Sequence, residues 1–436
     1  MSTITTKLDY EKVLAGQENM VHLATRIQAP LLETKNRKPV AFAICLDRSG
    51  SMNSEKKFDY ALKACEGVVQ NLRTNDLFSL VTFDDQMEVV VPMSTLDHKE
   101  RILSLIRELH TGGMTNLSGG WKVASDEFKK AEPGMLKRML LLTDGIANRG
   151  IVDHRQLITL VGDGMRNQGI RTSCLGFGES YPEDLLSDMA THATGNFYDV
   201  DTKDKLPAVF AAELEGALRI SMENLRIRVR EEEFCSSWSD FGGLRITETE
   251  DGIKEMLVGD LVSEEVRSFA LEVKVKSRNS LGTGNLISLD FAYDLITETG
   301  VEAKFESQTL QVSFVEDMKE VEPDESVLSI VSNQRASLII RHAIERIDEG
   351  SEREALDLLN HELEKLEAIQ RPELTGDSIL LIRSTIDRIN GGWTRTRGRK
   401  FAQYGVRSYA KMSSHEYWCA EDSFSPSFKQ FSDDEL

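Results

Sequence analysis

Two short stretches of the sequence place oxygen-bearing side chains directly after an apolar run. In LDRSGSM, Asp47, Ser49 and Ser51 stand at every second position. In LLLTDG, Asp144 follows a run of leucines that we expect to be buried. Carboxylate and hydroxyl oxygens, with no cysteine and no obligatory histidine among them, are ligands for a hard divalent cation. The two stretches therefore indicate a metal site, provided that both apolar runs end at a common edge.

A third stretch, TGGMTNLSGG, carries the Thr115 hydroxyl just ahead of a predicted helix, and its paired glycines let the backbone come close to a neighbour. We expect it to join the other two stretches, because ligands of open α/β sheets bind beyond the carboxyl ends of the strands. Mg²⁺ is the first choice of cation, with Mn²⁺ or Ca²⁺ as alternatives. Two aspartates leave the charge of the cation about neutralised, or under-neutralised if the carboxylates bind through water. Such an ion stays electrophilic and would readily accept a further carboxylate from outside. The five predicted ligands are Asp47, Ser49, Ser51, Thr115 and Asp144.

The elements that must position these residues alternate between apolar strands and amphipathic helices. Strands are expected at 40–46, 77–83, 87–92, 138–143, 170–178 and 196–200, and later helices at 97–109, 117–131, 154–167, 183–193 and 203–217. In the first helix Phe58, Leu62, Cys65 and Val69 recur on one face. Strands that are apolar on both faces and separated by helices predict a mostly parallel, doubly wound α/β domain, with 87–92 as its antiparallel edge. We assign it residues 37–217.

After residue 218 the apolar residues alternate with a period of two, which predicts half-buried antiparallel strands at 225–229, 269–275, 289–293 and 310–314. One more such strand, 21–27, precedes the α/β domain. A lone strand cannot bury its apolar face. We therefore infer that residues 1–36 complete a β-sandwich formed by 218–318, and that the α/β domain is inserted into this sandwich.

The remaining sequence predicts a helical region, 319–392, and a charged tail, 393–436. Three apolar stripes between Glu325 and Asn390 indicate three helices that form a small bundle or a docking face. Gly350 is expected to end the first helix, and Ser351 with Glu354 to form a capping box for the second. The tail is basic and then acidic. It is most simply solvated, although its basic part could serve as an arm for an acidic partner or a nucleic acid.

Composition excludes several classes of protein. The 436 residues include 52 Lys and Arg against 72 Asp and Glu, a formal net charge of −20, which disfavours nucleic acid as the main partner. The polar beginning of the chain does not resemble an export signal, and the longest apolar run is about a third of the roughly 20 residues that a membrane helix needs. Five cysteines without CxxC spacing favour a reducing cytoplasm.

In these motifs the chain resembles the von Willebrand factor A (VWA) family. The metal-ion-dependent adhesion site (MIDAS) of that family has the pattern Asp-x-Ser-x-Ser, a later threonine, and an aspartate in a Thr-Asp-Gly turn. All three parts occur here in that order over about 37–217. The resemblance implies that Ser49, Ser51 and Thr115 bind the metal directly, that Asp47 and Asp144 bind it directly or through water, and that an acidic residue of a protein partner fills the open position. The flanking β-sandwich is similar to that of bacterial cytoplasmic members.

Other functions fit the residues less well. Phosphotransferases of the haloacid dehalogenase kind use an aspartate after the first strand, but need a second aspartate where Ser49 stands. No GxxxxGK[ST] phosphate loop occurs, and HELEKLE from His361 lacks the second histidine of a metalloprotease motif. We therefore predict a non-enzymatic, metal-dependent protein-binding module. A metal-dependent hydrolase or phosphotransferase using Asp47, and a scaffold with a non-essential metal site, stay as alternatives, as does a second partner for the helices or the basic tail.

Overall fold

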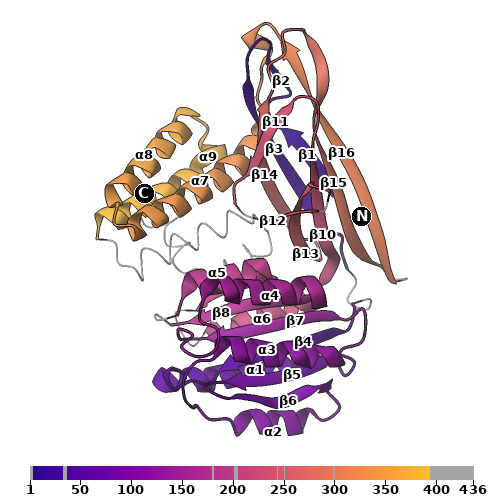
Figure 1. Ribbon diagram of the computed structural model, residues 1–436, viewed down its shortest axis with the longest axis vertical. Helices are drawn as coiled ribbons and strands as arrows, with labels where there is room; N and C mark the ends of the chain where they lie inside the picture. The colour runs from indigo at the N-terminus through magenta and orange to yellow at the C-terminus, as the bar shows by residue number, and fades with distance from the viewer. Residues whose placement is uncertain are drawn as a thin grey trace. The chain divides into compact units, whose positions relative to one another are not determined.

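The computed structural model describes residues 3–32, 37–178, 181–200, 205–242, 244–249, 251–297 and 300–392 (Figure 1). These residues form two compact units. Among the described residues, one unit is continuous and comprises 32–220, whereas the other combines 3–31 with 221–392. The predicted tail, 393–436, lies outside the described residues. Among the described helices, none is both long and apolar enough to cross a membrane.

The continuous unit is built on a six-stranded sheet of order β6-β5-β4-β7-β8-β9. Its strands are β4 (Val40–Asp47), β5 (Leu77–Phe83), β6 (Met87–Thr95), β7 (Leu136–Thr143), β8 (Ile170–Phe177) and β9 (Thr194–Val200). Neighbouring strands are parallel except β5 and β6, which are antiparallel at one edge, as predicted. Every residue of β4 and β8 is buried, because helices cover both faces of the sheet.

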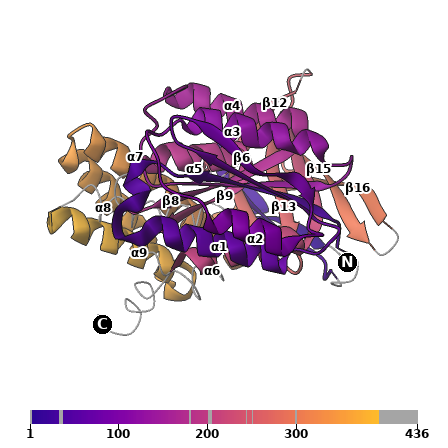
Figure 2. The same cartoon turned by 90° about the horizontal axis from the view of Figure 1, so that it is seen from below.

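Two groups of helices provide this cover, and Figure 2 shows the sheet between them. The helices are α1 (Lys57–Asn71), α2 (Lys99–Arg107), α3 (Leu117–Glu127), α4 (His154–Gln168), α5 (Glu183–His192) and α6 (Leu206–Leu218). The first group, α1, α2 and α6, packs on one face, and α3, α4 and α5 pack on the other. The predicted stripe of α1 is buried on the first face. Polar side chains at the strand ends can therefore gather only at the rim of the sheet.

The other unit contains two sheets with a shared core. The first has the order β1-β3-β14-β11, from β1 (Thr3–Leu8), β3 (Asn19–Gln28), β14 (Val266–Val275) and β11 (Cys235–Asp240). The second has the order β12-β13-β10-β15-β16-β2, from β12 (Arg245–Glu248), β13 (Lys254–Val262), β10 (Ile220–Glu231), β15 (Gly282–Thr297), β16 (Gly300–Val315) and β2 (Lys12–Leu14). The upstream strand, β3, pairs with β14 along its whole length. In the second sheet β2 and β16 run parallel, whereas the pairs β12–β13, β10–β15 and β15–β16 are antiparallel.

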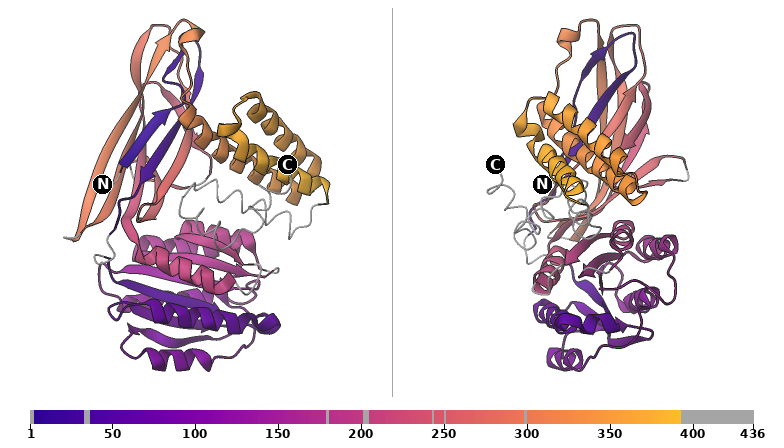
Figure 3. Two further views of the ribbon diagram at one scale, coloured as in Figure 1. Left: turned by 180° about the vertical axis from the view of Figure 1, so that it is seen from behind. Right: turned by 90° about the vertical axis from the view of Figure 1, so that its left-hand side faces the viewer.

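Three helices complete this second unit: α7 (Glu325–Asp348), α8 (Glu352–Ala368) and α9 (Pro372–Asn390). They share an apolar core, and Figure 3 shows them beside the sandwich. The side chain of Gln334 in α7 fixes the bundle to β14, because it accepts a hydrogen bond from the Ala270 amide (2.7 Å) and donates to the Ser268 carbonyl (3.3 Å).

The capping box predicted for the second helix of this bundle is wrong. Gly350 does follow the first helix with a left-handed φ of 83°, as expected of a helix terminator. Ser351, however, makes no side-chain capping bond. Its ψ of 57° lies outside the extended backbone region typical of a capping residue, and its amide is already bonded to the Arg346 carbonyl at 2.8 Å. The tight link between the helices therefore replaces the predicted motif.

Candidate metal site at the strand ends

The two predicted carboxylates lie at the same edge of the parallel sheet. Asp47 is the last residue of β4, and Asp144 directly follows β7. These strands are neighbours, with Leu46 opposite Leu142, so both chains leave the sheet side by side. Both aspartates are buried, Asp47 with no exposed surface and Asp144 with 2%. The order of the strands thus brings together two residues that are far apart in the sequence.

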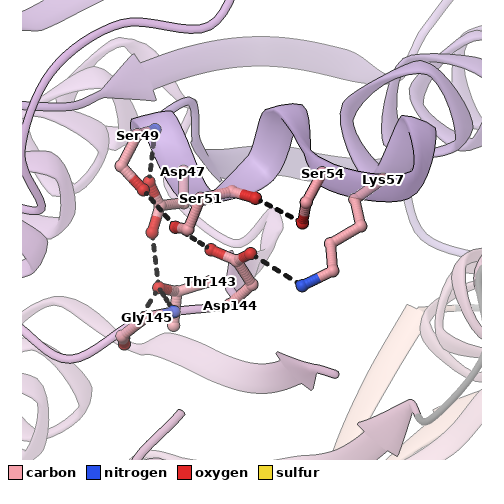
Figure 4. Close-up of polar contacts among 8 residues, drawn as sticks. All are labelled: Asp47, Ser49, Ser51, Ser54, Lys57, Thr143, Asp144 and Gly145. Carbon is pink, nitrogen blue, oxygen red and sulfur yellow. Dashed lines mark hydrogen bonds and ion pairs between the residues drawn. The ribbon is translucent and has the colours of Figure 1, made fainter. Parts of the chain in front are cut away.

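Hydrogen bonds connect four of the five predicted residues (Figure 4). The Ser49 amide donates to Oδ1 of Asp47 at 2.7 Å, and the Ser49 and Ser51 hydroxyls lie 3.1 Å apart. The Ser51 hydroxyl in turn donates to Oδ1 of Asp144 at 2.6 Å. Thr143 donates its hydroxyl to Oδ2 of Asp47 at 2.5 Å, which holds that carboxylate between the two strands. The side chains spaced two residues apart after β4 therefore form one oxygen cluster with Asp144.

The fifth residue, Thr115, borders the same space from the loop between α2 and α3. A Cβ atom added at Gly145 would lie 3.5 Å from the Thr115 hydroxyl and 3.6 Å from that of Ser51. The Thr115 carbonyl also accepts hydrogen bonds from the amides of Asn148 (3.0 Å) and Arg149 (3.2 Å). The structure thus brings all five predicted residues together, with Gly145 next to the hydroxyls of Thr115 and Ser51.

Paired glycines allow the loop of Thr115 to approach the loop after β4. The Gly112 amide donates to the Arg48 carbonyl at 2.6 Å, and the Gly50 amide donates to the Gly113 carbonyl at 3.0 Å. A Cβ atom at Gly112 would lie only 1.9 Å from Oδ2 of Asp84. A larger residue at Gly112 would have to displace the Asp84 side chain, which follows β5, so this glycine allows the close approach that the sequence suggested.

Asp84 supports the site, and the sequence analysis missed it. Its Oδ2 accepts hydrogen bonds from Nε of Arg48 (3.1 Å) and the Gly113 amide (3.2 Å). Burial alone would raise the pKa of this carboxyl, but the amides of Gln86 and Gly113 and the Arg48 guanidinium lower it below the usual value. The sequence did contain an indication, because Asp84 directly follows β5 at the same edge of the sheet.

Lys57 is a second contributor that spacing did not reveal. Its ammonium group lies 2.9 Å from Oδ2 of Asp144 and 5.3 Å from the centre of the Phe177 ring. A short 3₁₀ segment (Gly50–Lys56), which ends with Lys56 at φ 60°, sets the direction of α1 and places Lys57 beside the site. This ammonium offsets one carboxylate, so a divalent cation would leave the site with a net positive charge.

Burial controls the protonation of Asp47. Loss of water raises its pKa to about 6, and hydrogen bonds from Thr143 and Ser49 only partly oppose this, while the nearby charge of Asp144 adds to it. A cation bound beside the carboxyl would favour the ionised form. Metal binding at this site is therefore expected to weaken as the pH falls through about 6.

The donor set suits a hard cation. No cluster of three or more His, Cys, Asp or Glu that could hold a metal occurs among the described residues. The site instead combines two carboxylates with three hydroxyls, all oxygen donors, at one edge of the sheet. Mg²⁺ sites of this kind need only one or two carboxylates because water completes the coordination. The five residues therefore fit a divalent cation, although their role as ligands stays a prediction.

The fold and the site define a known class of domain. Residues 42–212 match the family model of the von Willebrand factor type A domain. The chain therefore contains a VWA domain, as the motifs indicated. Domains of this class mediate protein–protein interactions, often with a metal, and are typically not enzymes.

Two curated proteins resemble parts of the chain. Over 198 residues, 44% of this chain, it is 28% identical to the uncharacterized protein YfbK of Escherichia coli strain K12. Over 259 residues, 56% of this chain, it is 24% identical to inter-alpha-trypsin inhibitor heavy chain H1 of Bos taurus. The matching segments cover only 33% and 27% of those proteins, so the chain corresponds to a third or less of their length.

Two solved structures are similar over almost the whole chain. The von Willebrand factor type A protein from Catenulispora acidiphila aligns with a TM-score of 0.70 at 14% identity, and covers 94% of this chain and 96% of its own. The ArnB paralog VWA2 from Sulfolobus acidocaldarius aligns with a TM-score of 0.60 at 17% identity, covering 94% and 98%. At these identities the likeness shows the fold alone.

Proposed function

We propose that the VWA domain binds a divalent cation at the oxygen cluster and that this cation accepts an acidic side chain of a protein partner. Mg²⁺ is the first choice, with Mn²⁺ or Ca²⁺ as alternatives. The observation that carries the proposal is the convergence of three loops on one cluster of hydroxyl and carboxylate oxygens beside Gly145. The proposed ligands are Asp47, Ser49, Ser51, Thr115 and Asp144.

Each group of residues has a distinct role in this proposal. The three hydroxyls supply oxygen donors without adding negative charge. Asp47 fixes the backbone of Ser49 through the 2.7 Å hydrogen bond, and Asp144 positions the Ser51 hydroxyl. Because Lys57 offsets the charge of Asp144, the loaded site attracts a carboxylate from outside. The bound cation supplies the positive charge that this carboxylate contacts.

Titration of the purified protein with Mg²⁺ and Mn²⁺, followed by calorimetry, tests the metal site. Thr115→Ala removes one hydroxyl ligand and should weaken binding at least tenfold, with the fold retained. Thr159→Ala removes a hydroxyl from the exposed side of α4 and is the matched control. Unchanged metal affinity in Thr115→Ala would refute the assignment of the ligands. Capture of the same partners with and without EDTA then tests whether binding depends on the metal.

An enzymatic role for Asp47 fits the geometry less well. Its side chain has no exposed surface, and both of its oxygens already accept hydrogen bonds, from Ser49 and Thr143. A nucleophile must instead reach its substrate. Hydrolysis of a phosphoester by the pure protein that disappears in Asp47→Ala would favour the phosphotransferase or hydrolase alternative. Partners that bind equally well in EDTA would favour a scaffold with a non-essential metal.

We also propose that the protein works in a reducing compartment such as a bacterial cytoplasm. Among the described residues, four cysteines are free and buried: Cys45, Cys65, Cys174 and Cys235. Buried thiols that form no disulfide are typical of reducing surroundings. Fractionation of cells that express the full chain would test this location.

A further inference from the structure

The exposed apolar side chains of the VWA domain are concentrated beside the metal site. Large apolar side chains that are more than a third exposed occur at four described positions of this domain, and all four lie in loops or strand ends next to the site. They are Met87 (39% exposed), Met114 (47%), Ile146 (64%) and Val152 (55%), which we call the apolar rim. Scattered exposed apolar residues need no explanation, but a gathering at one site is typical of an interaction surface.

Two members of the rim are sequence neighbours of residues at the site. Met114 precedes Thr115, and Ile146 follows Gly145, and these two residues of the site lie close together although they belong to different loops. The Met114 sulfur also lies 3.1 Å from Nε of Arg149, which ties the loop of Met114 to the loop of Ile146. Two exposed apolar side chains therefore lie within one residue of the site, on two different loops.

The other two members extend the rim along the same loops. The Met87 sulfur lies 3.6 Å from the side-chain nitrogen of Asn116, the residue after Thr115. Val152 follows Ile151, whose amide donates to the Ser118 hydroxyl at 2.9 Å near the beginning of α3. These two members of the rim are thus linked to the residues that follow Thr115 in the chain.

The fold does not account for these exposed side chains. The same loops reach the core through other residues, because Leu117 is fully buried and Ala147 is only 8% exposed. The rim side chains are the ones that point away from this core. Apolar surface of this kind gains free energy when a partner covers it, and the unbranched side chains of methionine adapt to different partner shapes.

We propose that the apolar rim recognises apolar residues on both sides of the partner's acidic residue. This inference rests on the proposed function, since the acidic residue is the one that the cation accepts. The partner is therefore a protein segment with Asp or Glu flanked by large apolar side chains. An acidic segment with polar neighbours would satisfy the cation but leave the rim exposed to water.

Synthetic peptides test this inference with a defined probe. A panel carries a central Glu flanked on both sides by Leu or Phe, or by Ser, and binding is measured in Mg²⁺ and in EDTA. We expect Mg²⁺-dependent binding, with apolar-flanked peptides at least tenfold tighter than Ser-flanked ones. Met114→Ser combined with Ile146→Ser should abolish this preference and leave the affinity for Mg²⁺ alone unchanged. Phe305→Ser, at a position 68% exposed outside the VWA domain, is the matched control and should change nothing.

The outcomes separate the two proposals. Mg²⁺-dependent binding of all acidic peptides with equal affinity would overturn the role of the rim and support the metal-dependent function. A preference that persists in the doubly substituted protein would also overturn it. If no acidic peptide binds in a Mg²⁺-dependent manner although Mg²⁺ itself binds, both the inference and the acceptance of an acidic residue are wrong.

Discussion

Burial of Asp47 is expected to destabilise the VWA domain whenever no metal is bound. The pKa of this carboxyl is about 6 in the folded protein, against 3.8 for an ordinary aspartate. The folded state therefore holds the proton more tightly than the unfolded state. As the pH rises from about 4 through 6, ionisation costs folding free energy, and above 6 the full cost is present. Asp47→Asn removes the ionisation but keeps an oxygen that can accept the Ser49 amide.

The size of this effect follows from the shift in pKa. A shift of about two units corresponds to about 3 kcal/mol at 1.36 kcal/mol per unit. The altered hydrogen bond with Thr143 should reduce this gain in stability by about 1 kcal/mol. We therefore expect Asp47→Asn to raise the free energy of unfolding of the metal-free protein by about 2 kcal/mol at pH 7.5. That is a large part of the roughly 5–15 kcal/mol by which domains are stable.

Urea unfolding in EDTA, at pH 7.5 and at pH 4, measures this difference. The full chain has two compact units, so the transition of the VWA domain is followed separately, for example by exchange of amides in β4 and β7. The gain from Asp47→Asn should be present at pH 7.5 and largely absent at pH 4. Asp126→Asn, at an exposed surface pair, is the control and should change stability by less than about 0.5 kcal/mol. A variant that is less stable than the wild type at pH 7.5 would refute the argument, as would an equal gain at both pH values.

Two further substitutions test the surroundings of the site. Lys57→Met removes a positive charge 2.9 Å from Asp144 and should tighten Mg²⁺ binding about tenfold by calorimetry; unchanged or weaker binding would contradict the charge balance inferred here. Gly112→Ala places a Cβ against Asp84 and should cost about 1–3 kcal/mol of stability and weaken Mg²⁺ binding. Gly67→Ala in α1 is the control, because the added Cβ meets no neighbour, and it should stabilise the protein by about 0.5–1 kcal/mol. Equal effects of the two alanines on urea unfolding would show that the contact of Gly112 with Asp84 is not what makes Gly112→Ala destabilising.

The sequence allowed the α/β domain and the grouping of its site residues to be predicted because buried parallel strands have a strong local pattern. The runs 40–46, before Asp47, and 139–142, before Thr143, are apolar throughout. Such a run identifies both the strand and the place where it ends. Parallel strands then end at one edge, so residues that follow them are brought close together. The antiparallel edge at Met87 was also predictable from its short turn.

Features that depend on distant partners or on local backbone angles were not predictable. The strands β1, β2, β11, β12 and β13 were not predicted; the first four have only 3–6 residues, and all five are defined by the strands beside them. The contact of Lys57 with Asp144 depends on the 3₁₀ segment before α1. The failed capping box at Ser351 shows the same limit, since its sequence fits the motif while its backbone angles do not.

The pairing of β3 with β14 also sets the order in which the chain can fold during synthesis. Gln28 lies opposite Val266, so β3 leaves the ribosome long before its neighbour is made. The VWA domain contains all of its own strands between these two segments and can fold first. Until β14 emerges, the backbone groups along that edge of β3 have no native strand to pair with. A chain truncated between the VWA domain and β14 should therefore leave the amino-terminal strand exposed to chaperones and proteases.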